Sequence, residues 1–163
     1  MLNRERLRAL FNYDANTGHL IRIEATKGYP PNRRITRVND QGYLITTVDG
    51  ETWRVHHLVW IWHHDEHVEE IDHRNRIRHD NRIDNLRPCD HQPNCGNSRP
   101  RVHKYKGVTF CKLTGRWKAQ IGVNYKNVNL GRYDTMEQAA LAYNAAAIRH
   151  FGEFAYLNEV VEC

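Results

Sequence analysis

The chain has 163 residues, of which 40% are hydrophobic and 26% charged, so it can form one ordinary domain or two small ones. Its average composition excludes collagen-like, disordered and mucin-like chains. No apolar run approaches the ~20 residues that a membrane helix needs, and the first residues lack a signal-peptide core. We therefore expect an intracellular protein that is not secreted and has no membrane partner. Its four cysteines are too few for a disulfide scaffold.

The net charge of +5 and the 11 histidines are unevenly distributed along the chain. Eight of the histidines lie between His56 and His91. Residues 101–133 carry eight basic residues and no acidic one, whereas residues 134–163 carry one basic and five acidic residues. The histidine-rich centre and the basic segment behind it therefore predict two different roles.

The first fifty residues predict one short helix and several short strands. An amphipathic pattern over Arg4–Phe11 indicates the helix, and Asp49-Gly50 is a strong hairpin signal between two strand-like runs. The expected strands are His19–Glu24, Ile35–Val38, Tyr43–Val48 and Thr52–His56. We therefore expect residues 1–50 to form a small β-rich segment without catalytic residues.

Residues 51–100 have the pattern of a separate small domain. The apolar, aromatic run Leu58–His64 predicts a short buried helix, and an acidic stretch then leads into a strand that ends at Asp72-His73. A polar loop over residues 74–85 and a helix-like stretch over residues 90–98 follow.

Asp72 and His73 are followed by two asparagines whose positions allow a metal site. Asn85 comes 13 residues after Asp72, and Asn94 comes 22 residues after it. A carboxylate and an amide oxygen that converge on one point suit a hard cation such as Mg²⁺, which keeps most of its water. The imidazole of His73 could then take a proton from a water that attacks a phosphodiester. Because Asp-His pairs are common, the spacing alone leaves open a structural role for these residues.

The centre of the chain, over about residues 42–99, resembles the phage-type, homing-endonuclease-like HNH endonucleases. The motifs that carry the resemblance are Arg54-Val55-His56-His57-Leu58-Val59-Trp60, Ile71-Asp72-His73, Asn81-Arg82-Ile83-Asp84-Asn85-Leu86-Arg87, and Asn94 with Asn97. The segment Tyr13-Asp14-Ala15-Asn16-Thr17-Gly18 is similar to the leader segment of that family.

This resemblance implies a ββα-metal fold around one divalent cation, either Mg²⁺ or alternatively Mn²⁺ or another divalent ion. It implies that Asp72 and Asn94 are the metal ligands and that His73 is the general base. Asn85 would hold the loop and orient His73, and His56 would support the site.

Residues 101–163 predict a three-stranded sheet followed by a helix. The strand-like runs are Lys106–Phe110, Arg116–Val123 and Lys126–Tyr133. Thr135 with Gln138 predicts a capping box at the start of a helix that ends at Phe151. The many alanines of this helix suit close packing onto a sheet.

Alternation along these strands separates a polar face from an apolar face. On the second strand, one face carries Arg116, Lys118, Gln120 and Gly122, and the other carries Trp117, Ala119, Ile121 and Val123. On the third strand, Asn127, Asn129 and Gly131 lie on the polar face, opposite Val128 and Leu130. The helix must cover the apolar face, which leaves lysine and arginine to bind phosphates and glutamine and asparagine to bind adenine edges. Eight basic residues without an acidic one favour DNA binding over an ordinary solvated face.

This segment resembles the ethylene-response-factor (Apetala-type) DNA-binding domain over about residues 103–158. The matching motifs are Tyr105-Lys106-Gly107-Val108, Trp117-Lys118-Ala119-Gln120-Ile121, Leu130-Gly131-Arg132-Tyr133-Asp134-Thr135, Ala139-Ala140-Leu141-Ala142-Tyr143-Asn144 and Phe151-Gly152-Glu153-Phe154-Ala155. The resemblance implies that the sheet binds the DNA major groove, with contact positions at Lys106, Thr109, Gln120, Gly122, Asn127 and Asn129. The DNA-binding residues expected from pattern and resemblance together are Lys104, Lys106, Thr109, Lys112, Arg116, Lys118, Gln120, Asn127 and Asn129.

The sequence thus predicts an α+β protein in three parts. Residues 1–50 are expected to form the β-rich segment, residues 51–100 an HNH nuclease core of the ββα-metal type, and residues 101–163 a three-stranded antiparallel sheet packed on one α-helix. The expected function is a divalent-metal-dependent DNA endonuclease that hydrolyses phosphodiester bonds with His73 as general base. It would act on double-stranded DNA, with no small-molecule substrate, as a monomer or transient dimer in the cytoplasm of an infected bacterial host. The alternative is a non-catalytic, sequence-specific DNA-binding regulator with an inactive HNH core.

Overall fold

The protein is described by a computed structural model that covers residues 2–26, 30–89 and 104–160. The chain divides into two compact units, Met1–Cys89 and Asp90–Cys163. The boundary expected after residue 50 falls inside the first unit, and the boundary expected after residue 100 falls inside the second. Within the described ranges, no helix is long and apolar enough to cross a membrane.

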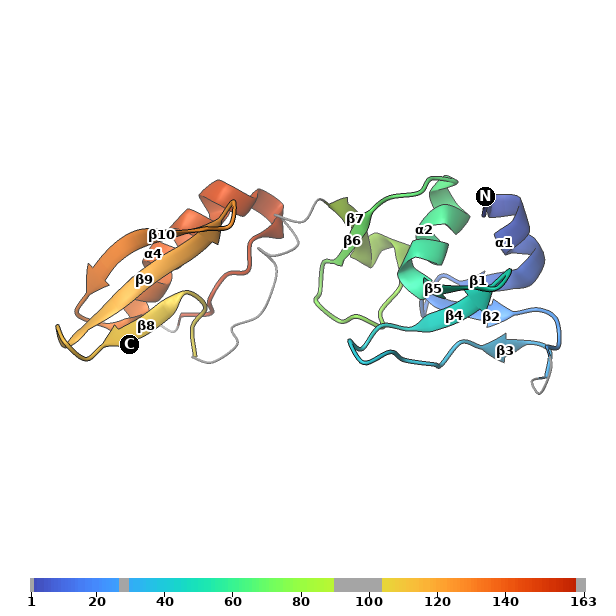
Figure 1. Ribbon diagram of the computed structural model, residues 1–163, viewed down its shortest axis with the longest axis horizontal. Coiled ribbons are helices and arrows are strands. Elements are labelled where there is room, and N and C mark those ends of the chain that lie inside the picture. The colour runs from blue at the N-terminus through green and yellow to red at the C-terminus, as the bar shows by residue number, and fades with distance from the viewer. Residues whose placement is uncertain (1, 27–29, 90–103, 161–163) are drawn as a thin grey trace. The chain divides into compact units, whose positions relative to one another are not determined.

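The described part of the N-terminal unit combines helices α1 and α2 with small antiparallel sheets (Figure 1). In chain order its elements are α1 (Arg4–Leu10), β1 (Phe11–Asp14), β2 (His19–Arg22), β3 (Arg33–Arg34), β4 (Ile45–Val48), β5 (Glu51–Arg54), α2 (Val55–His64), β6 (Glu70–His73), the 3-10 turn η1 (Ile83–Asn85) and β7 (Leu86–Cys89). Strands β1, β2 and β3 form one sheet, β4 pairs with β5, and β6 pairs with β7.

Short-range signals explain where several of these elements begin and end. The side chain of Asn3 caps α1 by accepting a hydrogen bond from the backbone N–H of Arg6 at 2.9 Å. Asp49 and Gly50 have φ values of 47° and 88°, as a type I′ turn requires, and they join β4 to β5. The hairpin predicted from Asp49-Gly50 is therefore present.

The strands before β4 differ from those expected. The chain leaves the helical conformation at Phe11, which begins β1 and pairs with Arg22 of β2, so Phe11 is not the last residue of α1. The expected strand Ile35–Val38 is absent, and of its residues only Val38 forms an isolated bridge, with Leu44. Pairing with a distant segment rather than local composition decides both cases. The helix expected over residues 90–98 lies outside the described residues.

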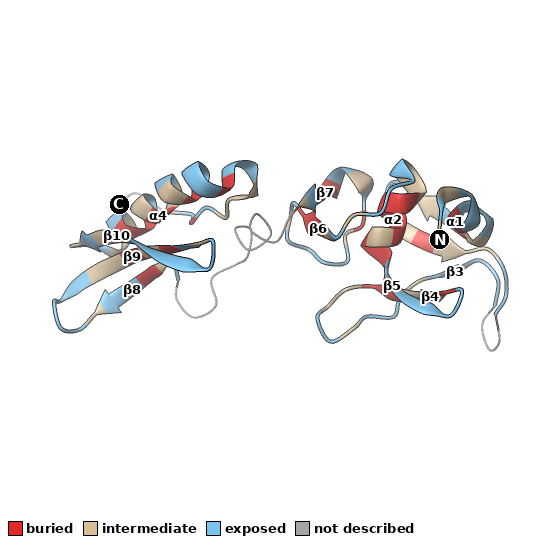
Figure 2. Cartoon of the chain, turned by 45° about the horizontal axis from the view of Figure 1, so that its top comes forward, coloured by how far each residue is buried: buried red, intermediate tan, exposed pale blue. Residues whose placement is uncertain are grey.

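Helix α2 lies at the centre of the N-terminal core and is coloured as buried over much of its length in Figure 2. Val55 and Leu58 are at most 1% exposed, as the apolar run in the sequence predicts. Leu7 of α1 packs into the same cluster, together with Ile71 of β6 and Leu86 of β7. One hydrophobic core therefore joins segments on both sides of residue 50.

In its described residues, the C-terminal unit is a three-stranded antiparallel sheet with a helix along one face (Figures 1 and 2). Its elements are β8 (Val108–Cys111), β9 (Arg116–Val123), β10 (Lys126–Tyr133), α4 (Met136–Phe151) and the 3-10 turn η2 (Gly152–Phe154), and the strand order is β10-β9-β8. The bounds of β9 and β10 are those that the sequence pattern predicts.

Alanines bring helix α4 close to the sheet. Ala139, Ala140 and Ala147 are fully buried against the apolar face of β9 and its neighbours. The hydroxyl of Thr135 accepts a hydrogen bond from the backbone N–H of Gln138, whose side chain accepts one from the backbone N–H of Thr135. The predicted capping box is therefore present and fixes the start of α4.

A β-bulge in β10 changes the face on which its last residues lie. The register shifts between Asn129 and Gly131, so Leu130 has no direct partner in β9. After the bulge, Gly131 pairs with Ala119 and Arg132 pairs with Lys118. The prediction that Gly131 lies on the polar face is therefore wrong, because simple alternation does not hold across a bulge.

Candidate functional site

The outer face of the C-terminal sheet gathers polar side chains from all three strands. Thr109 of β8 pairs with Lys118 of β9, and Gln120 of β9 pairs with Asn129 of β10. Directly paired residues of antiparallel strands point to the same face, so these side chains lie side by side. We call the set Thr109, Lys118, Gln120, Asn127, Asn129 and Arg132 the polar sheet face.

Arg132 was not among the residues expected to bind DNA. The bulge at Leu130 places Arg132 beside Lys118, and its side chain is exposed. A guanidinium group and an ammonium group therefore lie side by side on the polar sheet face. Gly131 is the sequence signal that could have indicated the bulge, because a glycine inside a strand often marks one. In the structure its φ is 120°.

Four other predicted residues complete the set expected to bind DNA, and of these Arg116 lies on the same face as Lys118, two residues along β9. Arg116, at the start of β9, forms an exposed ion pair with Asp134 at 2.8 Å. Lys112 lies in the exposed turn between β8 and β9. Lys104 and Lys106 precede β8, and each ammonium group lies over an aromatic ring, 4.8 Å from the centroid of Tyr105 and 5.7 Å from that of Tyr156, respectively.

The polar sheet face has the chemistry of a nucleic-acid surface. Its two cations can bind phosphate groups, and its three amide side chains can each donate and accept hydrogen bonds at a base edge. Residues 101–133 contain no acidic residue that would offset these cations. The polar sheet face therefore combines positive charge with side chains that can distinguish base pairs by hydrogen bonding.

A second group of predicted residues surrounds a buried histidine pair in the N-terminal unit. The rings of His56 in α2 and His73 in β6 lie edge to face with their centroids 5.0 Å apart. Burial, with smaller contributions from His73, His57 and Arg54, lowers the pKa of His56 to about 2. Burial also lowers the pKa of His73, against the opposing effects of Asn81 and Asp72. Both rings are therefore uncharged at neutral pH.

The carboxylate of Asp72 is engaged by a neighbouring guanidinium group. One oxygen of Asp72 accepts hydrogen bonds from Nε and Nη2 of Arg87, at 3.0 and 2.7 Å, on the paired strand β7. Both side chains are buried, at 7% and 6% exposure. Breaking such a buried pair by removing one partner typically costs about 3–5 kcal/mol, so the pair is an integral part of the fold.

Asn81 contacts His73, although the sequence did not indicate it. Its side-chain oxygen lies 3.1 Å from Nε2 of His73, and Asn81 is fully buried. Tyr13 holds the same loop, because its hydroxyl accepts a hydrogen bond from the N–H of Ile83 and donates one to the carbonyl of Asn81. Gly18 lies so close to Asn81 that a Cβ atom there would collide with the loop backbone. The resemblance of the segments 13–18 and 81–87 pointed to this region but gave Asn81 itself no role.

The side chain of Asn85 bonds within the loop that follows β6. Its amide donates to the side chain of Asn75 at 3.0 Å and to the carbonyl of Asp80 at 2.8 Å, and its oxygen accepts from the N–H of Asn75. Arg82 forms an ion pair with Asp80 at 2.6 Å and lowers the pKa of that carboxyl group to about 2. Asn85 is thus a structural link across the loop between β6 and β7.

The predicted metal site is only partly covered by the structure. Asn94, the second expected ligand, lies outside the described residues. Within the described ranges, no three side chains of His, Cys, Asp or Glu come together in a way that could hold a metal ion. One carboxylate oxygen of Asp72 is bonded to Arg87. Mg²⁺ binding stays a prediction that depends on Asn94.

Comparison with known proteins concerns mainly the C-terminal unit. Residues 103–153 match the family model of the AP2 domain. APETALA2-like protein 2 from Oryza sativa subsp. indica is 47% identical over 60 residues, which make up 37% of this chain and 14% of that protein. The AP2-like ethylene-responsive transcription factor TOE2 from Arabidopsis thaliana is 43% identical over 63 residues, or 39% of this chain and 13% of that protein.

A longer match is found with another plant protein. The ethylene-responsive transcription factor WRI1 from Arabidopsis thaliana is 36% identical over 94 residues, or 56% of this chain and 21% of that protein. The chain covers 14% of the length of APETALA2-like protein 2 and 21% of that of WRI1, so each match concerns a small part of the relative.

These matches contradict the expected function. Two of these relatives, TOE2 and WRI1, are named as transcription factors and not as enzymes, so the predictions of a metal-dependent DNA endonuclease and of a phosphodiester hydrolase are wrong. The expected phage origin and bacterial host are likewise not supported, because these relatives come from rice and Arabidopsis. The alternative prediction, a DNA-binding regulator, fits the relatives better. The resemblance of the C-terminal segment is confirmed, because residues 103–153 match the AP2 domain.

Proposed function

We propose that this protein is a non-catalytic, sequence-specific regulator that binds double-stranded DNA through the polar sheet face. The observation that carries the proposal is the alignment of Lys118 and Arg132 with the amides of Gln120, Asn127 and Asn129 on one exposed face of the AP2 domain. The relatives that share this domain are named as transcription factors, which favours a regulator over an enzyme.

The width of the sheet supports binding in the major groove, because three strands about 4.8 Å apart span about 10 Å. The groove is about 12 Å wide, and β-sheets and β-ribbons are known to enter it. Lys118 and Arg132 would contact phosphates or guanine edges, while Gln120 and Asn129, which lie side by side, would form hydrogen bonds with base edges. Helix α4 lies on the opposite face and supports the sheet without entering the groove.

For the N-terminal unit we propose an inactive core of the HNH type. The ββα arrangement requires a strand, a loop, a second strand and a helix, and β6, the following loop and β7 supply the first three. The ion pair of Asp72 with Arg87 supports an inactive core, because it engages one of the two carboxylate oxygens with which Asp72 could bind a metal ion. The role of this core would then be structural.

A comparison of two arginine variants tests the proposed DNA surface. Arg132→Ala removes a charge from the polar sheet face, and Arg149→Ala removes one from the exposed end of α4. One phosphate contact contributes about 0.9 to the slope of log K against log salt, which corresponds to about fivefold in affinity at 0.15 M salt. The measurement is fluorescence anisotropy with a duplex selected by the full-length chain from a random library.

Arg132→Ala is expected to weaken binding about fivefold and to flatten the salt dependence, whereas Arg149→Ala leaves both unchanged. Gln120→Ala should reduce the preference for the selected duplex over a scrambled one by about 1–3 kcal/mol. Equal affinities for Arg132→Ala and Arg149→Ala, or no preference of the parent for any duplex, would contradict the proposed function.

A further inference from the structure

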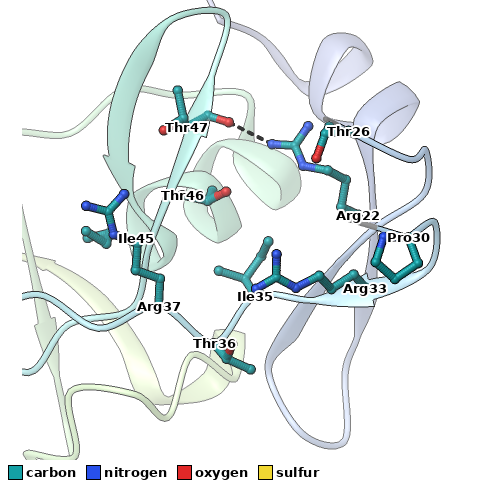
Figure 3. Close-up of a pocket in the computed structure, with 10 residues that line it drawn as sticks. All are labelled: Arg22, Thr26, Pro30, Arg33, Ile35, Thr36, Arg37, Ile45, Thr46 and Thr47. Carbon is teal, nitrogen blue, oxygen red and sulfur yellow. Dashed lines mark hydrogen bonds between the residues drawn. The ribbon is translucent and has the colours of Figure 1, made fainter. Parts of the chain in front are cut away.

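The N-terminal unit contains a pocket lined by arginine and threonine side chains (Figure 3). Its volume is about 370 Å³, within the range typical of ligand sites. Strands β2, β3 and β4 and the segments next to them supply the lining. The polar lining residues are Arg22, Arg33, Arg37, Thr26, Thr36, Thr46 and Thr47, and the apolar ones are Pro30, Ile35 and Ile45.

The lining can bind anions but offers no carboxylate to a cation. It contains three guanidinium groups and four hydroxyl groups, and none of its ten residues is acidic. The segment of residues 25–39, which supplies part of the lining, is also positively charged, because it includes four basic residues and no acidic one. Arginine presents a planar fork of N–H donors that matches the oxygens of a phosphate group.

Arg22 is held in place at the side of the pocket. Its guanidinium group donates a hydrogen bond of 2.7 Å to the carbonyl of Thr47, shown as a dashed line in Figure 3. The same group lies over the ring of Phe11, 4.6 Å from the centroid. Asp49, which attracts Arg22 electrostatically, is bonded through both carboxylate oxygens to Arg6. One wall of the pocket is therefore rigid and positively charged before any ligand binds.

We propose that this pocket binds a backbone phosphate of the DNA duplex that the polar sheet face recognises. Arg33 and Arg37 would bind the phosphate oxygens, and the threonine hydroxyls would supply further donors. Such a contact carries no sequence information, so the N-terminal unit would add affinity while the sheet supplies specificity. This inference rests on the proposed function, since it assigns a second contact to the same DNA.

The double variant Arg33→Ala with Arg37→Ala tests the pocket in the full-length chain. Loss of one phosphate contact should weaken binding about fivefold at 0.15 M salt and reduce the slope of log K against log salt by about 0.9. Arg34→Ala is the matched control, because Arg34 is exposed, adjacent to Arg33 on β3 and absent from the pocket lining. The affinity of the Arg34→Ala variant for the duplex should stay within about twofold of that of the parent.

The outcomes separate this inference from the proposed function. If Arg132→Ala weakens binding but the double variant does not, the pocket proposal is wrong and the sheet proposal stands. Equal losses for the double variant and Arg34→Ala would also overturn the pocket proposal, because they would indicate diffuse surface charge. Thermal unfolding of each variant in the absence of DNA serves as the folding control.

Nuclear magnetic resonance distinguishes a DNA phosphate from a free anion. The backbone amide signals of Ile35 and Thr46 are followed during titration with a short duplex and, separately, with inorganic phosphate. The proposal expects shifts with the duplex at micromolar concentration that are lost in the double variant. Shifts with inorganic phosphate alone, with no effect of the duplex, would assign the pocket to a small anion and contradict the proposal.

Discussion

Acidification is expected to destabilise the N-terminal unit through His56. This histidine is 2% exposed and lies against His73 and His57. Among the described residues, its Nδ1 atom has no hydrogen-bond partner that would favour the charged ring. Burial and these neighbours hold its pKa at about 2, whereas an unfolded chain has the ordinary value of about 6.5.

The sign and size of the effect follow from these two pKa values. Between pH 6.5 and about 2 the unfolded chain binds a proton at this position and the folded chain does not, so stability falls as the pH falls. Each unit of pH within this window changes the free energy of unfolding by about 1.4 kcal/mol for one group. From pH 7 to pH 5 the contribution of His56 is therefore about 2 kcal/mol of lost stability.

Urea unfolding followed by tryptophan fluorescence measures this effect. Trp53, Trp60 and Trp62 report on the N-terminal unit, and the substitution Trp117→Phe removes the reporter of the other unit. His57, His63 and His73 also have pKa values lowered by burial, so the parent protein should lose more than the share of His56 alone.

The variant His56→Gln isolates the contribution of His56. The stability of the variant at pH 7 does not enter the comparison. The quantity compared is the free energy of unfolding that each protein loses between pH 7 and pH 5. This loss should be about 2 kcal/mol smaller in the variant than in the parent. An equal loss in both proteins would refute the reasoning, since it would mean that His56 is protonated without unfolding.

Two further predictions concern the C-terminal turn glycines and divalent cations. Gly107→Ala should destabilise the C-terminal unit by about 2–5 kcal/mol, because φ is +74° and a Cβ atom would collide with Tyr143 and the carbonyl of Gln120. Gly115→Ala, with a φ of +65° but open space around it, should cost only about 1–2 kcal/mol in urea unfolding read from NMR signals of β9. Removing divalent cations with a chelator should leave the DNA affinity measured by fluorescence anisotropy unchanged, because the polar sheet face would bind DNA through the charged side chains of Lys118 and Arg132. Loss of binding would contradict the proposed surface.

The C-terminal sheet and helix could be predicted because their signals are local. Alternation, turn residues and a capping box each act within a few positions, and the structure has the expected bounds for β9 and β10. The bulge at Leu130 was missed, because it depends on how β10 pairs with β9 and not on the composition of β10 alone. That single register shift decides whether Arg132 or Gly131 lies on the polar sheet face.

The environment of the central histidines was less predictable, because it depends on distant contacts. Asn81 reaches His73 through the fold of the intervening loop, and Tyr13 reaches that loop from 68 residues away. The pairing of Asp72 with Arg87 follows from the register of β6 with β7. Spacing along the chain identified Asp72 and His73 as neighbours but could not show which side chains would bind them.

The distribution of charge, rather than its sum of +5, supports the proposal that both units bind a polyanion. Charges at the protein surface act over about 8 Å at 0.15 M salt, so an acidic residue farther away does little to cancel a basic one. Of the described acidic residues that follow residue 133, Glu137 belongs to α4, which packs on the side of the sheet away from the polar face, and Asp134 is paired with Arg116. Residues 25–39 repeat the pattern around the arginine pocket, with four basic residues and no acidic one. Two acid-free segments, each placed on a surface with suitable donors, predict a steep salt dependence that the modest net charge alone would not suggest.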